Sequence, residues 1–298
     1  EENNIDVLKL YDFSKVIDLV NSQIEPIDYD YDNNDNKLTY YITRSAPKKD
    51  GTGTTETLEK HELDLTNTGI IENSADAGGD QIFLVKDGGT LNLEGGVLRN
   101  NASDRRVVCV SGGEFHMSGG YIVGGNHHYG GGGVFTSAGT MTMTGGVIAA
   151  NQSNLGGGIY AGGGTLDLSG GVVTGNVVTG NQVDNHGNGG GIFVTNATLN
   201  LSDEAYVTNN ILQQCNCPEN DVNNTHGGGG ITIGNGSTMN MFGGYVTGND
   251  AWLAGGGIYA GFCDNPITFA MSGGTIAGNH VEKGEGGGLR IAGRTNGV

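Results

Sequence analysis

The sequence is poor in proline and cysteine, and it contains no long hydrophobic run. Only 4 of the 298 residues are Pro and 4 are Cys, whereas 58 are Gly. A collagen-like chain needs Gly at every third position with abundant Pro, and four cysteines in a chain of this length do not make a disulfide scaffold. With no run of 18 apolar residues, we expect no membrane-spanning helix. A disordered Gly-rich linker is excluded as well, because 36% of the residues are hydrophobic.

Positive charge is also scarce. The chain has 14 Lys and Arg against 32 Asp and Glu, a net charge of −18. Nucleic-acid binding is driven by Lys and Arg that neutralise phosphates, and anionic lipid surfaces make the same demand. The charge therefore argues against both kinds of partner.

The cysteines are Cys109, Cys215, Cys217 and Cys263. The Cys215-Asn-Cys217 segment is consistent with a metal site, but a loop thiol pair or a bridge to Cys263 is the simpler interpretation. Neither the disulfide pairing nor the redox compartment follows from this spacing.

Glycine is distributed unevenly. Residues 1–77 contain only Gly51, Gly53 and Gly69, whereas about one residue in four is Gly in the rest of the chain. This step in composition predicts a leading segment over residues 1–77 and a Gly-rich domain over residues 78–298.

The Gly-rich part contains an internal repeat of about 25 residues when its loops are short. Each unit has a segment of alternating residues followed by Gly-Gly, an apolar pair and Asn, then a loop, then Gly-Gly-Gly with a second apolar pair. The alternating segments are TLNLEGG from Thr90, EFHMSGG from Glu114, TMTMTGG from Thr140, TLDLSGG from Thr165, TLNLSDE from Thr198, TMNMFGG from Thr238 and TFAMSGG from Thr268. The repeated Asn residues are Asn101, Asn126, Asn151, Asn176, Asn210, Asn249 and Asn279.

This repeat predicts an all-β parallel β-helix. Alternation with period two indicates strands with one buried face, and Gly allows the sharp corners between them. Three short strands per coil, stacked coil on coil, give about 7–8 coils and a rod of roughly 35–40 Å at about 4.8 Å per coil. We expect the repeated Asn amides to hydrogen-bond along the stack. All six Met residues fall on inward positions and should lie in the core.

The GGGI[YF] segments followed by G-x-Φ-x-x-N resemble the GGA[IL] and FxxN repeats of the polymorphic outer-membrane protein family, with Gly-Gly-Gly here where that family has Gly-Gly-Ala. Similar Gly-rich repeats occur in adhesin-like surface proteins of gut bacteria and methanogens. The resemblance covers about residues 78–298. It implies a right-handed β-helix and an extracellular or cell-surface location, commonly with an adhesive role.

Residues 1–77 read differently. Residues 14–21 predict a short helix, and residues 37–44 predict a strand rich in Thr, Tyr and Ile. Because the end of a β-helix exposes edge strands and core, we expect this segment to form an N-terminal α/β cap. The sequence stops within a repeat, so we also expect it to be a piece of a longer protein.

The outward residues of the alternating strands form two columns. One is mostly Thr, and the other contains His116 and Asp167. Such a face suits sugars or ice, although a solvated polar face rich in Thr is the simplest interpretation. Catalytic β-helices cleave polysaccharides with clustered carboxylates, which makes Glu114, His116 and Asp167 candidate catalytic residues.

The loops between Asn and Gly-Gly-Gly vary most, and function is usually carried by such loops. They all leave the same corner of the coil, so we expect them to project from one edge. Tyr129 and Trp252 could stack on a sugar or pack against protein. The candidate ligand-binding residues are His127, His128, Tyr129, Asn185, His186 and Trp252. Because adjacent side chains diverge, we interpret His127 and His128 as surface histidines rather than as a metal site.

Asp28, Asp30 and Asp32 alternate near the N-terminus. Calcium prefers such oxygens, but a calcium loop also needs Gly at its sixth position and Glu at its twelfth, and neither is present. We expect a solvated acidic turn, with calcium as the alternative and no other cofactor.

The sequence thus favours a non-catalytic extracellular domain that binds glycans or surface proteins of host or neighbouring cells. A polysaccharide lyase or glycosidase is the second hypothesis, and a passive surface stalk is the third.

Overall fold

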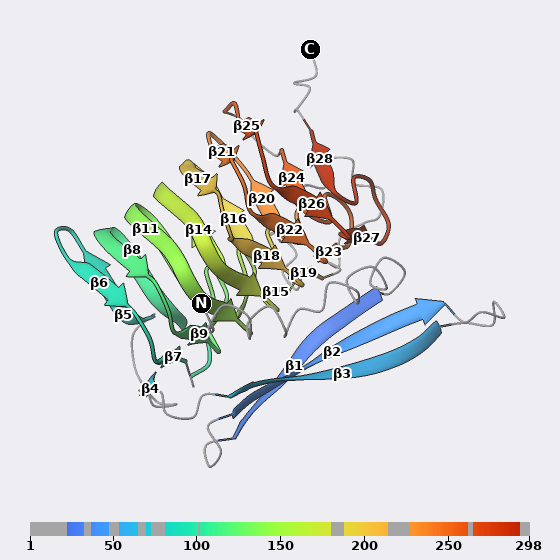
Figure 1. The fold of residues 1–298 in the computed structure, drawn as a ribbon, viewed down its shortest axis with the longest axis horizontal. Coiled ribbons are helices and arrows are strands. Elements are labelled where there is room, and N and C mark those ends of the chain that lie inside the picture. The colour runs from blue at the N-terminus through green and yellow to red at the C-terminus, as the bar shows by residue number, and fades with distance from the viewer. Residues whose placement is uncertain are drawn as a thin grey trace.

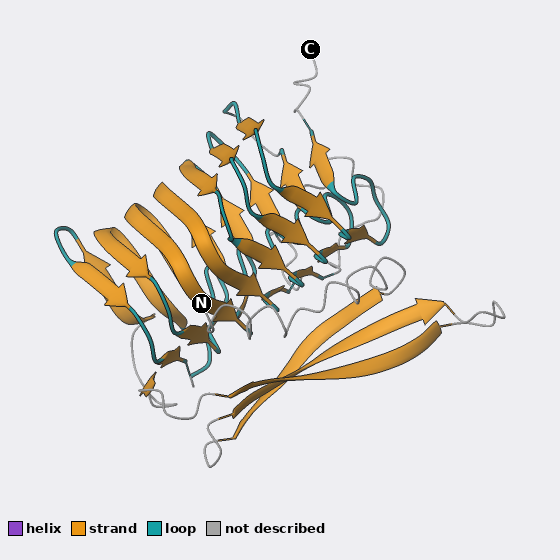
Figure 2. Cartoon of the chain, viewed as in Figure 1, coloured by secondary structure: helices purple, strands orange, loops and turns teal. Residues whose placement is uncertain are grey.

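The computed structural model describes residues 23–32, 37–47, 54–64, 70–72, 81–100, 102–179, 188–213, 227–261 and 265–292. Within these ranges the chain is all-β and contains no helix (Figure 2). Strands of successive repeats pair in parallel and form curled sheets around an apolar interior (Figure 1). The predicted all-β fold with parallel strands is therefore confirmed, and the curled sheets are consistent with the predicted parallel β-helix.

Each coil passes through four faces, which we number in chain order. Face 1, which carries the Thr-rich strands, contains β6 (Thr90–Leu93), the end of β8 (Arg106–Met117), the middle of β11 (Val134–Ala149), the start of β14 (Gly164–Thr174), β17 (Ala197–Leu201), β21 (Thr238–Met241) and β25 (Thr268–Met271). Face 2 contains β4 (Ile70–Glu72), β7 (Val97–Arg99), β9 (Tyr121–Val123), the ends of β11 and β14, β18 (Tyr206–Thr208), β22 (Tyr245–Thr247) and β26 (Thr275–Ala277).

Face 3 contains only two-residue strands: β10 (Asn126–His127), β12 (Gln152–Ser153), β15 (Val177–Val178), β19 (Ile211–Leu212), β23 (Asp250–Ala251) and β27 (His280–Val281). Face 4 contains β5 (Gln81–Lys86), the starts of β8 and β11, β13 (Ile159–Ala161), β16 (Ile192–Val194), β20 (Ile231–Ile233), β24 (Ile258–Ala260) and β28 (Leu289–Ile291). The predicted three strands per coil correspond to faces 1, 2 and 4. Face 3 is a fourth strand that the prediction lacks, because two residues are too few to show alternation.

The leading segment forms a separate three-stranded antiparallel sheet of β1 (Gln23–Asp32), β2 (Lys37–Pro47) and β3 (Thr54–Asp64). The predicted strand over residues 37–44 lies within β2. The helix predicted over residues 14–21 lies outside the described residues. Parallel stacking already begins at β4, which pairs with β7, so the first stacked strand precedes the predicted boundary at residue 78.

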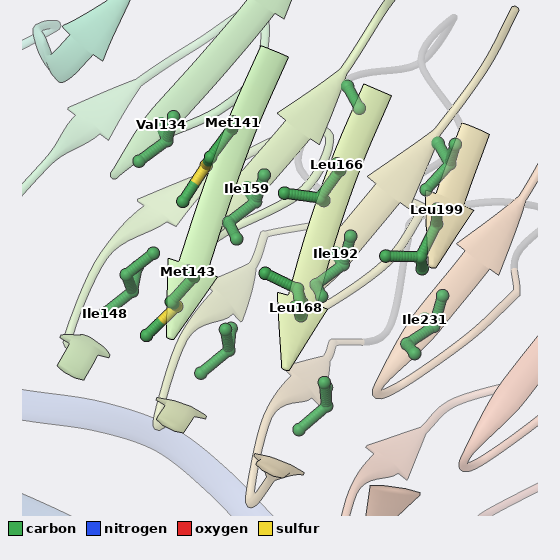
Figure 3. Close-up of a cluster of buried hydrophobic side chains, with 14 of the residues drawn as sticks. Val134, Met141, Met143, Ile148, Ile159, Leu166, Leu168, Ile192, Leu199 and Ile231 are labelled. Carbon is green, nitrogen blue, oxygen red and sulfur yellow. The ribbon is translucent and has the colours of Figure 1, made fainter. Parts of the chain in front are cut away.

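The register on face 1 is the one that the repeat predicts. Thr140 pairs with Glu114 on one side and Thr165 on the other, and Thr142 lies between His116 and Asp167. The alternate residues point inward and form the core, which Figure 3 shows for the middle coils.

Five of the six Met residues are buried, as predicted. They are Met117, Met141, Met143, Met239 and Met241. Met271 occupies the same inward column, paired with Met241, but is 46% exposed. It lies on β25, the last face 1 strand that the structure describes, so no further described coil covers it.

The predicted asparagine ladder is present from Asn151 onward. From Asn176 to Asn279, each side-chain oxygen accepts hydrogen bonds from both the main chain and the side chain of the Asn one coil earlier. Each side-chain NH₂ of the ladder also donates to a main-chain carbonyl of the preceding coil. The side-chain links are Asn151 to Asn176 at 3.0 Å, Asn176 to Asn210 at 3.0 Å, Asn210 to Asn249 at 3.0 Å and Asn249 to Asn279 at 2.9 Å.

The ladder does not include Asn126, and that part of the prediction is wrong. The position equivalent to Asn151 in the preceding coil is Gly125, whose main-chain N–H donates to the Asn151 side chain at 2.9 Å. Asn126 is exposed and pairs with Gln152 on face 3. One additional residue in this repeat moves Asn126 past the ladder, and Asn101 lies outside the described residues. In that coil Asn100 is buried instead, and its amide donates to the Gly124 carbonyl at 3.2 Å.

Candidate functional site

Two of the three candidate catalytic residues lie together on face 1. The His116 imidazole Nε2 is 3.2 Å from the Glu114 carboxylate, and both side chains are exposed. They occupy neighbouring outward positions of β8, as the alternation predicts. This is a solvent-exposed contact between an imidazole and a carboxylate on the outer side of β8.

Asp167 is not part of that pair. It lies two coils along the stack from His116, with Thr142 between them, a separation of about 10 Å along the stack axis. Its carboxylate accepts a hydrogen bond of 2.6 Å from Asn200, whose oxygen accepts one of 2.8 Å from Asn240. The structure therefore places Asp167 in a second polar ladder, on the outside of the stack.

The histidines after Gly125 do not behave as two surface residues. His127 takes the inward position of face 3, opposite Ser153, and is only 3% exposed. His128 and Tyr129 follow β10 on the outside, where Tyr129 is 64% exposed. The sequence predicted all three as loop residues, and for His127 that prediction is wrong.

Asp104 links this segment to the coil before it. Its carboxylate accepts a 3.0 Å hydrogen bond from the His128 main-chain N–H and also contacts the His128 ring nitrogen Nδ1. Partial burial raises the pKa of Asp104, but the hydrogen bonds from His128 and the charges of His127 and His128 outweigh it and lower this pKa below its ordinary value.

An arginine closes the inner side of the cluster. Arg106 is buried, and its Nη2 lies 3.0 Å from both ring nitrogens of His127. Its guanidinium also lies 4.4 Å from the centre of the Phe135 ring, a distance typical of a cation–π contact. Phe135 begins a row of rings on face 4, with Tyr160 at 5.2 Å and Phe193 at 5.1 Å beyond it.

The outer side of the cluster is a pair of rings. The Tyr129 ring centre lies 3.8 Å from that of His128, at 45°, and His128 lies 5.2 Å from His127. The main-chain N–H groups of Tyr129 and Gly130 both lie 3.3 Å from His127 Nδ1 and donate to it. The exposed Tyr129 ring is thus supported from below by the two histidines. We call this cluster the His127 corner: Asp104, Arg106, His127, His128 and Tyr129.

Trp252 lies at the other end of the same edge. It directly follows β23, and Tyr129 is the second residue after β10. The strands of face 3 between them place Trp252 about 20 Å along the stack. It is half-buried, and the Lys283 ammonium lies 5.7 Å from its ring centre. The expectation that these loops leave one edge is confirmed for Tyr129 and Trp252. Asn185 and His186 lie outside the described residues.

The structure describes the N-terminal aspartates and one of the four cysteines. Asp28, Asp30 and Asp32 lie in the regular strand β1, paired with Tyr41, Thr39 and Lys37, so the predicted acidic turn is a strand. Cys109 is buried in β8, and the other three cysteines lie outside the described residues.

Sequence reasoning missed Asp104 and Arg106, because both precede the repeat segment that contains Glu114. The inward position of His127 could in principle have been predicted from the sequence. Aligning Gly125 with Asn151, rather than Asn126 with Asn151, places His127 opposite Ser153 and Val178 in a buried column.

In comparisons with known proteins, no family model, no curated protein and no solved structure matches the chain. The described part of the chain also has no helix that is long and apolar enough to cross a membrane.

Proposed function

We propose that the chain is an extracellular, right-handed parallel β-helix of the adhesin-like kind, which binds glycans or surface proteins through the edge that follows face 3. The observation that carries the proposal is the exposed Tyr129 ring in contact with the His128 ring, with His128 held by Asp104 of the adjacent coil. A side chain fixed before binding loses little conformational entropy when a ligand covers it.

The chemistry of the edge suits a sugar. Aromatic rings present an apolar face with a polar rim, and Tyr adds a hydroxyl that can hydrogen-bond a sugar hydroxyl. Tyr129 and Trp252 sit on one edge about 20 Å apart, so an extended chain of sugars or a protein surface could contact both.

A second function is favoured by the Glu114–His116 pair. An imidazole 3.2 Å from a carboxylate on an exposed face is a possible acid–base unit for polysaccharide cleavage. Against it, the other candidate carboxylate, Asp167, lies two coils away and is hydrogen-bonded to Asn200.

A glycan array tests the binding proposal. We expect Tyr129→Ala to weaken binding at least about tenfold, the loss of about 1.4 kcal/mol, and Trp252→Ala to weaken binding of long glycans. Phe242→Ala is the matched control, because Phe242 is a 60% exposed aromatic residue on the turn after β21, away from this edge.

Three outcomes would contradict the proposal. Equal loss with Tyr129→Ala and Phe242→Ala would mean that the edge is not the binding site. New reducing ends or unsaturated uronate that disappear in Glu114→Gln would support the enzyme. No binding of any glycan or surface protein would leave a passive stalk.

A further inference from the structure

We propose that Asp104, His127 and His128 form a binding site for a divalent transition-metal ion of the zinc class. One donor atom from each side chain lies within 4.8 Å of the other two. The three residues come from adjacent coils, Asp104 from the loop before β8 and the histidines from β10 and the residue after it. The site shares Asp104 and His128 with the corner that supports Tyr129, but Zn²⁺ affinity can be measured whether or not the chain binds a glycan.

The donor set fits this class of ion. Two imidazole nitrogens and one carboxylate oxygen are ligands that Zn²⁺, Co²⁺, Ni²⁺ and Cu²⁺ accept, whereas Ca²⁺ and Mg²⁺ prefer oxygen alone. Three protein ligands leave a fourth tetrahedral position for water or for a group of a bound ligand. Donors lie about 2.0–2.2 Å from a bound ion, so the two exposed residues, Asp104 and His128, adjust their positions to place all three donors around one ion.

The fold brings together side chains that a regular strand would separate. On a strand His127 and His128 would point to opposite faces, but β10 ends at His127 and the chain turns there. The two rings consequently lie 5.2 Å apart with 30° between their planes. Asp104 holds the His128 ring from the neighbouring coil.

The charges around the site both oppose and favour a cation. The Arg106 guanidinium lies against His127 and repels a metal ion, although its contact with the Phe135 ring gives it a second partner. The Asp104 carboxylate supplies the compensating negative charge within the ligand set. A chain with a net charge of −18 also attracts cations at long range.

The test uses calorimetry to measure the equilibrium binding of Zn²⁺ to the full chain after a chelator has removed any bound metal. The absorption spectrum of bound Co²⁺ reports the ligand geometry. We expect a His128→Ala variant to lose affinity by at least about tenfold, because even the loss of an outer-shell partner costs about 10–100-fold. Asp104→Asn should also weaken binding. His116→Ala is the matched control, since His116 is an exposed histidine beside one carboxylate, Glu114, and it should bind as the unaltered protein does.

Unchanged Zn²⁺ affinity in both His128→Ala and Asp104→Asn would overturn the proposal, and so would equal loss in His116→Ala. Circular dichroism and the denaturant midpoint check that each variant is folded. If His128→Ala does not fold, Asp104→Asn decides the question, because Asp104 is an exposed loop residue.

Discussion

The middle and the two ends of face 3 carry different kinds of residue. In the middle, β15 and β19 present Val177, Val178, Ile211 and Leu212, all buried. At one end β10 buries His127 beside Arg106, and at the other β27 places His280 against Asp250. The two columns of face 3 therefore carry apolar side chains in the middle and titratable groups toward the ends, His127 in one column and His280 in the other.

The asparagine ladder follows the same division. Each Asn from Asn151 to Asn249 is buried and links to the next coil, whereas Gly125 takes that position at the N-terminal end. A Cβ atom at Gly125 would overlap the carbonyl oxygen of Gly132. The chain between Gly125 and Gly132 therefore leaves no room for a ladder side chain at this corner.

The comparison teaches where this kind of repeat can acquire function. A middle coil has neighbours on both sides that share its residue type, so a polar substitution inside it leaves unpaired groups. An end coil has irregular neighbours such as the loop of Asp104, which supply partners for a charge. Four measurements test this difference between the middle and the ends, and we give them in order of decreasing expected effect.

Asn210→Ala should be the most damaging change in the middle. The Asn210 side chain donates to Val173 and Asn249 and accepts from Asn176, and all of these groups are buried. Leaving several of them unpaired should lower the free energy of unfolding by about 4 kcal/mol, at about 1–3 kcal/mol for each buried unpaired group. Urea denaturation measures the loss.

Asn200→Ala is the control for that experiment. Asn200 belongs to the outer ladder on face 1 and is only partly buried, so water can replace its partners. Its loss should stay below about 1 kcal/mol. Equal losses at the two positions would show that the interior ladder does not stabilise the stack more than the outer one.

Met143→Ala and Met271→Ala compare the middle with the C-terminal end of one core column. Met143 is fully buried, whereas Met271 is 46% exposed. Truncating the first should cost about 3 kcal/mol through lost burial and a cavity, and truncating the second less than about 1 kcal/mol. Similar shifts in the thermal midpoint would indicate that Met271 is covered in solution.

Gly125→Ala tests the N-terminal end directly. Because its Cβ has no space beside Gly132, the backbone must move, and we expect a loss of about 2 kcal/mol. Gly95→Ala is the matched control, since no atom lies within 4 Å of a Cβ placed there. A neutral Gly125→Ala would mean that the close approach of Gly125 and Gly132 is not a constraint.

His280 should give the smallest effect, visible as pH dependence. Its hydrogen bond to Asp250 is the main cause that raises the pKa of His280 above 6.5, with burial acting against it. The imidazolium therefore stabilises the folded chain fully below pH 6.5, and this contribution is lost as the pH rises through the raised pKa. We expect on the order of 0.5 kcal/mol.

The measurement is the stability of the unaltered chain and of His280→Gln at about pH 5 and about pH 8, on either side of the histidine titration. The advantage of the unaltered chain should be present at the lower pH and vanish at the higher one. If the unaltered chain instead gains stability over His280→Gln as the pH rises, the His280–Asp250 contact does not stabilise the protonated imidazole.

Much of the stack was predictable because its repeats are in register. In a parallel stack, equivalent residues of successive units lie side by side, so aligning the Thr-initiated segments already places Thr140 between Glu114 and Thr165. The inward Met positions and the Asn151–Asn279 links follow from the same alignment. The alignment failed at Asn126, where one extra residue shifts the register.

The candidate site was predictable only in its residue types. His128 and Tyr129 were expected on a loop edge, and they are there. The burial of His127 and its contact with Arg106 were not, because face 3 is too short to be read from alternation. Asp104 and His128 are 24 residues apart, which is the offset between their two coils, but neither residue belongs to the alternating segments from which the repeat was aligned.

The repeat alone thus predicts that the coils stack in parallel, that the alternate residues face the core and that the asparagines from Asn151 onward pair along the stack. These features are predictable because every unit contains them. Only the tertiary structure decided that a fourth face exists and that Asp104, His127 and His128 meet. The reason is physical. A repeated contact is encoded in every unit, whereas a contact between two different loops depends on the path of the backbone at one corner.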